Sequence, residues 1–292
     1  MDLISLWKEK QAAGKIRFDA DLLVVQPISG GRNYNWGTVF YSKAREDYKT
    51  RIKQTERKTT FDLDLMRGLE LAEFGNLIVA ANPNSLFQGH LVIYPQKKSP
   101  ELAFQDIYDI TRLAQVQTGQ TFIHNMERSA ASILDWAHYQ AYPVVFPIEN
   151  ETGAALGEFG QVKIARISDD FPAYALVAEF FEVERVARWL LKILELLARS
   201  DNPHGQRIPC NFIWRKNRVW IIPRASNQSK LAANYFGGLE MGGIFCLPNA
   251  DHFRQYLPGV LRKEITEATL ACEPETQKWF EDNALRLLCE TI

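Results

Sequence analysis

The sequence is poor in cysteine and carries no excess of charge of either sign. Its four cysteines are widely spaced and form no Cys-x-x-Cys pair; they are Cys210, Cys246, Cys272 and Cys289. Neither a disulfide framework nor a zinc knuckle is therefore expected. The 34 basic and 35 acidic residues leave a net charge of -1, which argues against nucleic acid or a membrane surface as a general partner. RNA binding is further disfavoured because the aromatic residues do not alternate with a basic stripe.

Long apolar runs are also missing. No segment approaches the ~20 consecutive apolar residues that span a bilayer, and the charged, amphipathic stretch 1–10 does not resemble a secretory leader. We therefore expect a cytoplasmic protein with reduced cysteines. Hydrophobic residues make up 46% of the 292 positions, which is enough for a substantial core in one large domain or two smaller ones.

The first half of the chain predicts strands and a covering helix. Apolar runs predict strands at 76–82, 90–94, 122–125 and 136–146. Ser99 and Pro100 are typical of a helix start, and apolar residues recur from there at near-helical spacing up to Gly119. A helix with this spacing would cover one face of a sheet.

The second half repeats this arrangement weakly. An amphipathic helix is predicted at 183–197, strands at 208–214 and 218–222, a short strand after Gly243, and helices at 251–270 and 274–288. We interpret the chain as two α/β halves, 1–155 and 156–292, that pack as one unit. The fold class is α+β, with antiparallel sheets flanked by helices.

The segment Asp135-Trp136-Ala137-His138-Tyr139-Gln140 carries the chemistry. Side chains alternate along a strand, so Trp136, His138, Gln140 and Tyr142 are expected on one surface. A neutral imidazole nitrogen attacks phosphorus near pH 7, and an amide two residues on can donate to the phosphoryl oxygens. His138 and Gln140 are the candidate catalytic pair.

Three segments together resemble the branch of the histidine-triad superfamily that contains galactose-1-phosphate uridylyltransferase, dinucleoside tetraphosphate phosphorylase and the GDP-hexose phosphorylases. The first is Asn82 to Pro95, with Gln88-Gly89-His90-Leu91 at its centre. The second is Asn125 to Glu149, which includes His138-Tyr-Gln-Ala-Tyr142 and Phe146-Pro-Ile-Glu149. The third is Trp220 to Arg224, followed by Glu240-Met-Gly-Gly243. The resemblance implies two histidine-triad-like halves.

This resemblance implies a nucleotidyltransferase or phosphorylase with a covalent nucleotidyl-His138 intermediate. Its donor would be a nucleotide-sugar or a dinucleoside polyphosphate, and inorganic phosphate would be the acceptor. No metal or cofactor is expected. Relatives are often dimers, so a homodimer is one open arrangement.

Further site residues follow from the same resemblance. Those implied in nucleotide or phosphate binding are Arg57, Asn82, Asn125, Ser132 and Trp136. Two more candidates come from their positions: Arg128 is a cation in the loop of Asn125 and Ser132, and Arg224 follows a strand end of the second half. Asn and Ser are also ordinary turn residues, and Arg128 is equally compatible with a solvated charge. His90 and Tyr94 are expected to serve packing.

Trp136 marks a departure, because the family usually has His-x-His-x-Gln and this chain has Trp136 at the first histidine. A tryptophan there would stack a nucleobase or sugar, or would mark a protein that has lost turnover. The alternative function is therefore a catalytically silent nucleotide-binding or regulatory protein on the same fold. A third reading is a hydrolase in which water accepts the nucleotide.

Overall fold

The computed structural model describes residues 2–16, 18, 23–29, 35–42, 61–129, 131, 133–225, 236–247, 251 and 258–291. Arg57 and Ser132, two of the expected site residues, lie outside these ranges. No helix in the described part of the chain combines the length and apolarity needed to cross a bilayer.

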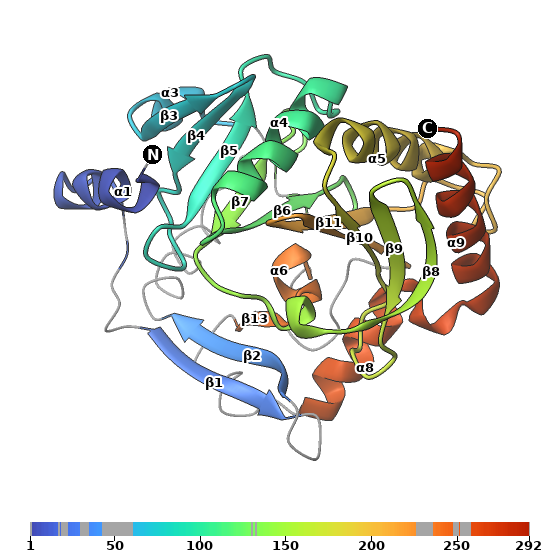
Figure 1. Ribbon diagram of the computed structural model, residues 1–292. Helices are drawn as coiled ribbons and strands as arrows, with labels where there is room; N and C mark the ends of the chain where they lie inside the picture. Colours follow the sequence, from blue (N-terminus) through green and yellow to red (C-terminus); the bar gives the residue numbers. More distant parts are fainter. Residues whose placement is uncertain are drawn as a thin grey trace.

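The core of the fold is a ten-stranded sheet with the order β3-β4-β5-β7-β6-β11-β12-β10-β9-β8, in which neighbouring strands are antiparallel (Figure 1). The first five strands along the chain are β3 (Glu70–Phe74), β4 (Leu77–Ala81), β5 (Leu91–Pro95), β6 (Thr121–Asn125) and β7 (Tyr139–Tyr142). The next five are β8 (Gly153–Phe159), β9 (Val162–Ile167), β10 (Leu176–Phe180), β11 (Cys210–Arg215) and β12 (Arg218–Pro223).

Both sets of five strands follow the same path. In each set the first three strands form a meander, and a helix then crosses the sheet. Two more strands follow, and the fifth strand of the set pairs with the third. The two sets meet where β6 pairs with β11. The α+β class with antiparallel sheets is thus confirmed. In this repeat β8 belongs to the second set, so the expected division after residue 155 falls inside that strand.

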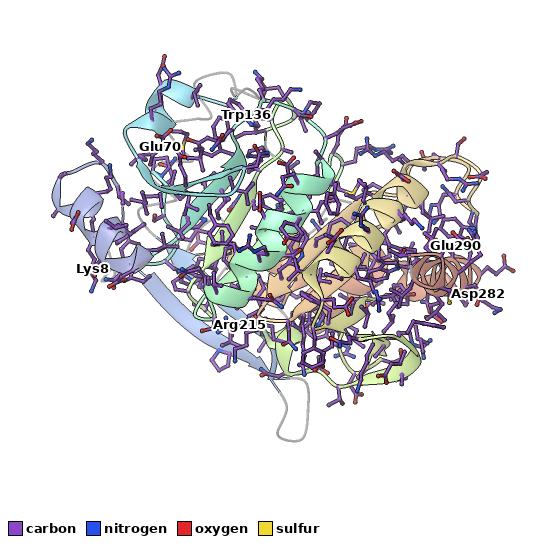
Figure 2. All side chains as sticks on the ribbon, turned by 45° about the horizontal axis from the view of Figure 1, so that its top comes forward. Lys8, Glu70, Trp136, Arg215, Asp282 and Glu290 are labelled. Atoms are coloured by element: carbon purple, nitrogen blue, oxygen red, sulfur yellow. The ribbon has the colours of Figure 1, made fainter. Side chains whose placement is uncertain are left out.

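Helices cover one face of the sheet. The long helices of that face are α4 (Phe104–Val116), α5 (Val183–Ala198) and α9 (Pro274–Cys289). Figure 2 shows α4 and α5 side by side across it. Helix α5 buries a stripe made of Val186, Ala187, Trp189, Leu190, Ile193, Leu196 and Leu197, which is the spacing of an amphipathic helix. The Trp189 Nε1–H donates to the Ala284 carbonyl at 2.9 Å and so ties α5 to α9.

A second layer covers the other face of the sheet. Its elements are β1 (Leu23–Ser29), β2 (Asn35–Ser42), β13 (Ile244–Leu247), α6 (Gly238–Met241), α8 (Pro258–Ala268) and the 3-10 turn η2 (Pro147–Asn150). Strands β1, β2 and β13 form a separate small sheet. Because successive side chains of a strand point to opposite faces of the sheet, the buried residues form two clusters, one on each face. Phe122 belongs to the cluster under the helices, whereas its neighbour Ile123 belongs to the cluster under this second layer. The remaining short elements are α1 (Leu3–Ala12), α3 (Leu63–Arg67) and η3 (Leu270–Cys272).

Two of the sequence predictions need correction. The strand expected at 136–146 is shorter in the structure, where β7 spans only Tyr139–Tyr142. Residues 135–137 form hydrogen bonds with Phe61, Pro95 and Ser99 instead of pairing in the sheet. The helix expected from Ser99 begins at Phe104 instead. The Ser99 hydroxyl donates to the Glu101 carbonyl at 2.8 Å and so closes a turn before the helix.

A buried ion pair joins the two strand sets. Arg215 Nε lies 3.1 Å from Glu149 Oε2, and the side chains are 14% and 6% exposed. Glu149 Oε1 also accepts from the Thr121 hydroxyl at 2.7 Å and from the Phe146 amide at 2.8 Å. Burial raises the pKa of Glu149, and the Thr121 and Phe146 hydrogen bonds and the Arg215 charge oppose this shift. The carboxylate thereby anchors η2 to the β6–β11 junction.

We expect Arg215→Met to lower the free energy of unfolding by about 3–5 kcal/mol, because it leaves the Glu149 carboxylate buried without its counter-charge. Urea unfolding of the single and double variants measures this effect. Arg215→Met/Glu149→Gln should regain part of the loss, since a neutral amide oxygen can still accept from Thr121 and Phe146. A double variant no more stable than Arg215→Met would contradict the ion-pair account.

Candidate active site

His138 stands immediately before β7, the strand that lies between β5 and β6. The last ladder pair of β6 and β7 is His124 with Tyr139, so the next position places His138 opposite Asn125. Side chains at directly opposite positions share a face. The side chains of His138 and Asn125 are therefore neighbours at this end of the sheet.

The approach to His138 is fixed at three consecutive residues. Asp135 accepts from the Phe61 amide at 3.1 Å and forms an ion pair with Lys98. The Trp136 Nε1–H donates to the Pro95 carbonyl at 3.1 Å, and the Ala137 amide donates to the Ser99 carbonyl at 2.6 Å. These bonds replace strand pairing and orient the residue that follows.

The hydrogen bonding of His138 selects one tautomer. Its Nδ1 lies 3.1 Å from the Trp136 carbonyl oxygen, which can only accept, so Nδ1 carries the hydrogen. In a neutral imidazole the lone pair is then on Nε2. Within the described part of the chain, the bond to Trp136 is the one hydrogen bond of this ring. Burial lowers the pKa of His138, with the Trp136 carbonyl and Asp135 acting in the opposite direction, and this favours the neutral, nucleophilic form.

A second histidine supports the backbone at this position. His124 Nδ1 donates to the His138 carbonyl oxygen at 2.9 Å. Burial lowers the pKa of His124 to about 4, so its ring is neutral near pH 7. His124 lies against the Tyr139 and Phe212 rings on the helix-covered side of the sheet. It acts through the backbone of His138 and has no access to a substrate on the other side.

The amide of Gln140 is oriented by its neighbours. His90 Nδ1 accepts from the Leu86 amide at 3.2 Å, so in the neutral ring Nε2 carries the hydrogen. Nε2 lies 3.2 Å from Gln140 Oε1, to which it can donate, and also 3.2 Å from Asn82 Nδ2. The Tyr142 hydroxyl donates to the same oxygen. With Oε1 occupied twice, the NH₂ group of Gln140 is left as a donor that forms no hydrogen bond within the described residues.

Asn125 is oriented in the same way, by a relay from the second strand set. Arg224 Nη1 donates to Asn211 Oδ1 at 2.7 Å, and Asn211 Nδ2 donates to Asn125 Oδ1 at 2.7 Å. The Gly238 amide donates to this oxygen too, at 2.8 Å. The chain of donors begins at a guanidinium, which cannot accept, so the orientation of both amides is determined. The NH₂ group of Asn125 is again free of hydrogen bonds to the described residues.

Two of the expected binding residues are buried. Trp136 is 5% exposed, and its ring packs against Phe61 and Tyr94. Arg224 is 1% exposed; its Nε and Nη1 donate to the Ala268 and Phe236 carbonyls besides Asn211. Burial lowers the pKa of Arg224 to about 10. The structure therefore corrects the stacking role expected for Trp136 and the direct ligand role expected for Arg224: both support the site from within.

The remaining expected residues lie at the surface. Asn82 is half-buried and begins the turn between β4 and β5 that carries His90; its backbone amide donates to the His90 carbonyl at 3.0 Å. Arg128 follows β6 in a left-handed conformation, with φ 63°, and its side chain is exposed. Within the described part of the chain, no group of three His, Cys, Asp or Glu side chains is placed to hold a metal ion.

Sequence reasoning missed the positioning roles of His90 and Asn211. His90 was assigned to packing, and its ring does stack on Tyr142 with centroids 4.3 Å apart. No local pattern links His90 with Gln140, which lies fifty positions later in the chain. Asn211 begins an apolar strand, and a buried polar residue at such a position is the signal that would have identified it.

Comparisons with known proteins were made on sequence and on structure. No family model matches the sequence, and no curated protein matches it. The structure is similar to the yeast Ap4A phosphorylase Apa2, with a TM-score of 0.67 at 10% identity over 91% of this chain and 95% of that one. Apa2 in complex with AMP gives 0.66 at 11% identity over 91% and 94%, and Apa2 in complex with Ap4A gives 0.62 at 11% over 91% and 95%. The chain therefore has the fold of this phosphorylase over nearly its whole described length, as the resemblance in sequence implied.

Proposed function

We propose that the protein is a nucleotidyltransferase of the phosphorylase type. In the first step His138 Nε2 forms a bond to the α-phosphorus of the donor, and the bond from that phosphorus to the leaving-group oxygen breaks. The leaving group departs with the electron pair, as a nucleoside polyphosphate from a dinucleoside polyphosphate or as a sugar phosphate from a nucleotide-sugar. His138 then holds the nucleoside monophosphate as an imidazolium phosphoramidate, with the hydrogen still on Nδ1.

The second step regenerates the histidine. An oxygen of inorganic phosphate forms a bond to the same phosphorus, the P–Nε2 bond breaks, and the electron pair returns to Nε2. The product is a nucleoside diphosphate. No proton has to be moved to or from His138 in either step, because the Trp136 carbonyl holds the Nδ1 hydrogen throughout.

The observation that carries this proposal is the arrangement around His138. A lone pair on Nε2 is placed near two amides whose oxygens are already occupied, those of Gln140 and Asn125. Their NH₂ groups can donate only outward. Donors fixed before the reaction stabilise the charge that develops on phosphoryl oxygens without reorganisation during it.

The donor class is a nucleotide-sugar or a dinucleoside polyphosphate. Support for the second comes from the fold, since the similar Apa2 structures contain AMP and Ap4A. Support for the first comes from the segment His138 to Glu149, which resembles the GDP-hexose phosphorylases. Arg57 and Ser132 are proposed to contact the nucleotide as the resemblance implies, and Asn82 to lie near the nucleoside.

We expect His138→Ala to abolish covalent labelling of the protein by the donor. The measurement is intact-mass analysis after incubation with a panel of dinucleoside polyphosphates and nucleoside diphosphate hexoses, without phosphate. Wild type should gain the mass of one nucleoside monophosphate on His138, and Lys278→Ala on the exposed side of α9 should label like wild type. Binding of nucleotide by wild type without any adduct or turnover would instead favour the silent nucleotide-binding protein.

We expect Gln140→Glu to slow adduct formation about 100- to 1,000-fold, the usual effect of removing such a donor. Glutamate can still accept from His90 and Tyr142, but it cannot donate to a phosphoryl oxygen. Single-turnover labelling measures the rate, and urea unfolding checks that the fold is retained. Gln161→Glu in the exposed β8–β9 turn is the matched control. Equal rates for both variants would remove Gln140 from the mechanism.

The pH dependence follows from the lowered pKa of His138. The neutral ring reacts, so the rate of adduct formation should be level at neutral pH and fall only as the pH drops through a midpoint below 6.5, the ordinary histidine value. Rapid-quench labelling across acidic pH, with stability checked at each value, measures the midpoint. A midpoint at or above 6.5 would be inconsistent with a desolvated nucleophile.

A further inference from the structure

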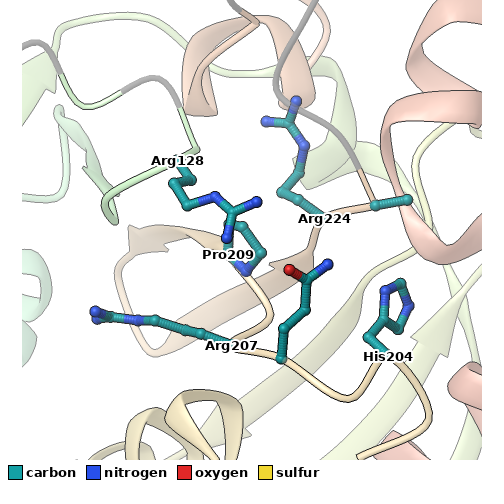
Figure 3. A pocket seen from close by; sticks show the side chains of 7 residues that line it. Arg128, His204, Arg207, Pro209 and Arg224 are labelled. Carbon is teal, nitrogen blue, oxygen red and sulfur yellow. The ribbon is translucent and has the colours of Figure 1, made fainter. Parts of the chain in front are cut away.

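A small pocket lies where the loop after β6 in the first strand set meets loops of the second set. It has a volume of about 140 Å³ and is lined by Arg128, His204, Gln206, Arg207, Pro209, Arg224 and Ala225. Figure 3 shows Arg128 and His204 on opposite sides of the pocket, with Pro209 between them. The volume is well below the roughly 300–1,000 Å³ of pockets that enclose drug-sized ligands. A group of a few atoms fits it, and a nucleoside does not.

The loop that carries Arg128 is held in place. The Ser129 amide donates to the Met126 carbonyl at 3.0 Å, and the Ser129 hydroxyl lies within hydrogen-bond distance of the Met126 and Cys210 carbonyls. Between these anchors Arg128 adopts φ 63°, a conformation that costs free energy in any residue with a side chain and is concentrated at functional sites. The backbone conformation of Arg128 is therefore held by the hydrogen bonds of Ser129.

The opposite wall is equally preformed. Asn202 Nδ2 donates to the Arg199 and Gln206 carbonyls at 2.6 and 2.7 Å, and its Oδ1 accepts from the His204 amide at 2.8 Å. Asn202 is 8% exposed, so these bonds are shielded from water. The loop needs no rearrangement before a ligand enters.

Among the described basic side chains that line the pocket, Arg128 is the one without a bonding partner, since the Arg224 guanidinium donates to Asn211 and to the Ala268 and Phe236 carbonyls. His204 pairs with Glu273 at 2.5 Å, and Arg207 lies 3.7 Å from Glu127. Within the described part of the chain, Arg128 has neither an ion pair nor a hydrogen bond from its guanidinium. Gln206 is exposed at the same pocket. A guanidinium fork and an amide donor together match a phosphate group.

The pocket is linked to the proposed reaction centre by Asn211. Its Nδ2 donates both to Asn125 Oδ1 and to the Ser129 carbonyl, at 2.7 and 2.9 Å. Asn125 is the amide proposed to hold the transferred phosphoryl group, and Arg128 follows it by three residues. One buried side chain thus sets the position of the amide and of the loop that bears the arginine.

We propose that this pocket binds, through Arg128 and Gln206, the phosphate group that leaves or attacks the phosphorus bonded to His138. The inference rests on the proposed function for its role in the reaction. The group is inorganic phosphate when it acts as acceptor, or the adjacent phosphate of the donor when it leaves with the leaving group. Both have the same chemistry at the pocket, and in the second step the phosphate oxygen attacks as the P–Nε2 bond breaks.

The first test is binding of inorganic phosphate alone, measured by ³¹P NMR or calorimetry. Arg128→Gln/Gln206→Glu removes the cation and adds a carboxylate at the pocket, and it should weaken binding at least about tenfold, the factor expected from one lost charge-assisted hydrogen bond. Arg286→Gln/Gln161→Glu makes the same changes at exposed positions away from the pocket and should bind like wild type. Equal affinity in the two double variants, or no saturable binding by wild type, would overturn the proposal.

The second test separates the two sources of the phosphate. If the pocket holds the acceptor, Arg128→Gln/Gln206→Glu should form the nucleotidyl-His138 adduct at the wild-type rate but release it to phosphate at least about tenfold more slowly. If it holds the leaving group, adduct formation itself should slow. An unchanged rate in both steps would exclude a role in exchange. Should wild type form no adduct at all, the proposed function fails, and the binding measurement alone still decides whether the pocket is a phosphate site.

Discussion

The antiparallel pairing of β6 with β11 is the constraint on which the site depends. It joins two five-stranded sets into one sheet and places Asn125 directly opposite Asn211. Asn125 belongs to the set that carries His138, whereas Asn211 brings the buried charge of Arg224 from the other. The first set would contain the histidine and its glutamine without the second, but its asparagine would have no fixed orientation. The duplicated topology therefore has a structural consequence, since the first set carries His138 and the second set orients the amide of Asn125 opposite it.

The side-chain amides near His138 are oriented because their oxygen atoms already accept hydrogen bonds. Gln140 and Asn125 each have an amide oxygen that receives two hydrogen bonds. An amide in this state presents only N–H groups, and a cluster of outward N–H groups next to a neutral imidazole favours an anion without requiring a net positive charge. The proposed phosphate site therefore needs no excess of positive charge over the whole chain, whose net charge is -1.

The replacement of the usual first histidine by Trp136 has a structural explanation. The tryptophan is buried against Phe61 and Tyr94 and bonded to the Pro95 carbonyl. Its backbone carbonyl still accepts the His138 Nδ1–H, a role that any residue at this position can fill. The tryptophan thus differs from the histidine of the resembled pattern in its packing contacts, while the hydrogen bond that selects the tautomer is made by the backbone.

Local pattern and residue chemistry determined the class of fold, most of the long helices and central strands, and the pairing of His138 with Gln140, because periodicity and short spacing are properties of neighbouring residues. Strands such as β8, whose residues are largely exposed or half-buried, lack that pattern and were not predicted. The tertiary structure alone decided which amide oxygens are occupied, that Arg224 is buried, and that Arg128 faces a loop some eighty residues away at the same pocket. These features arise from contacts between distant segments, and no property of the local sequence encodes which segments will meet.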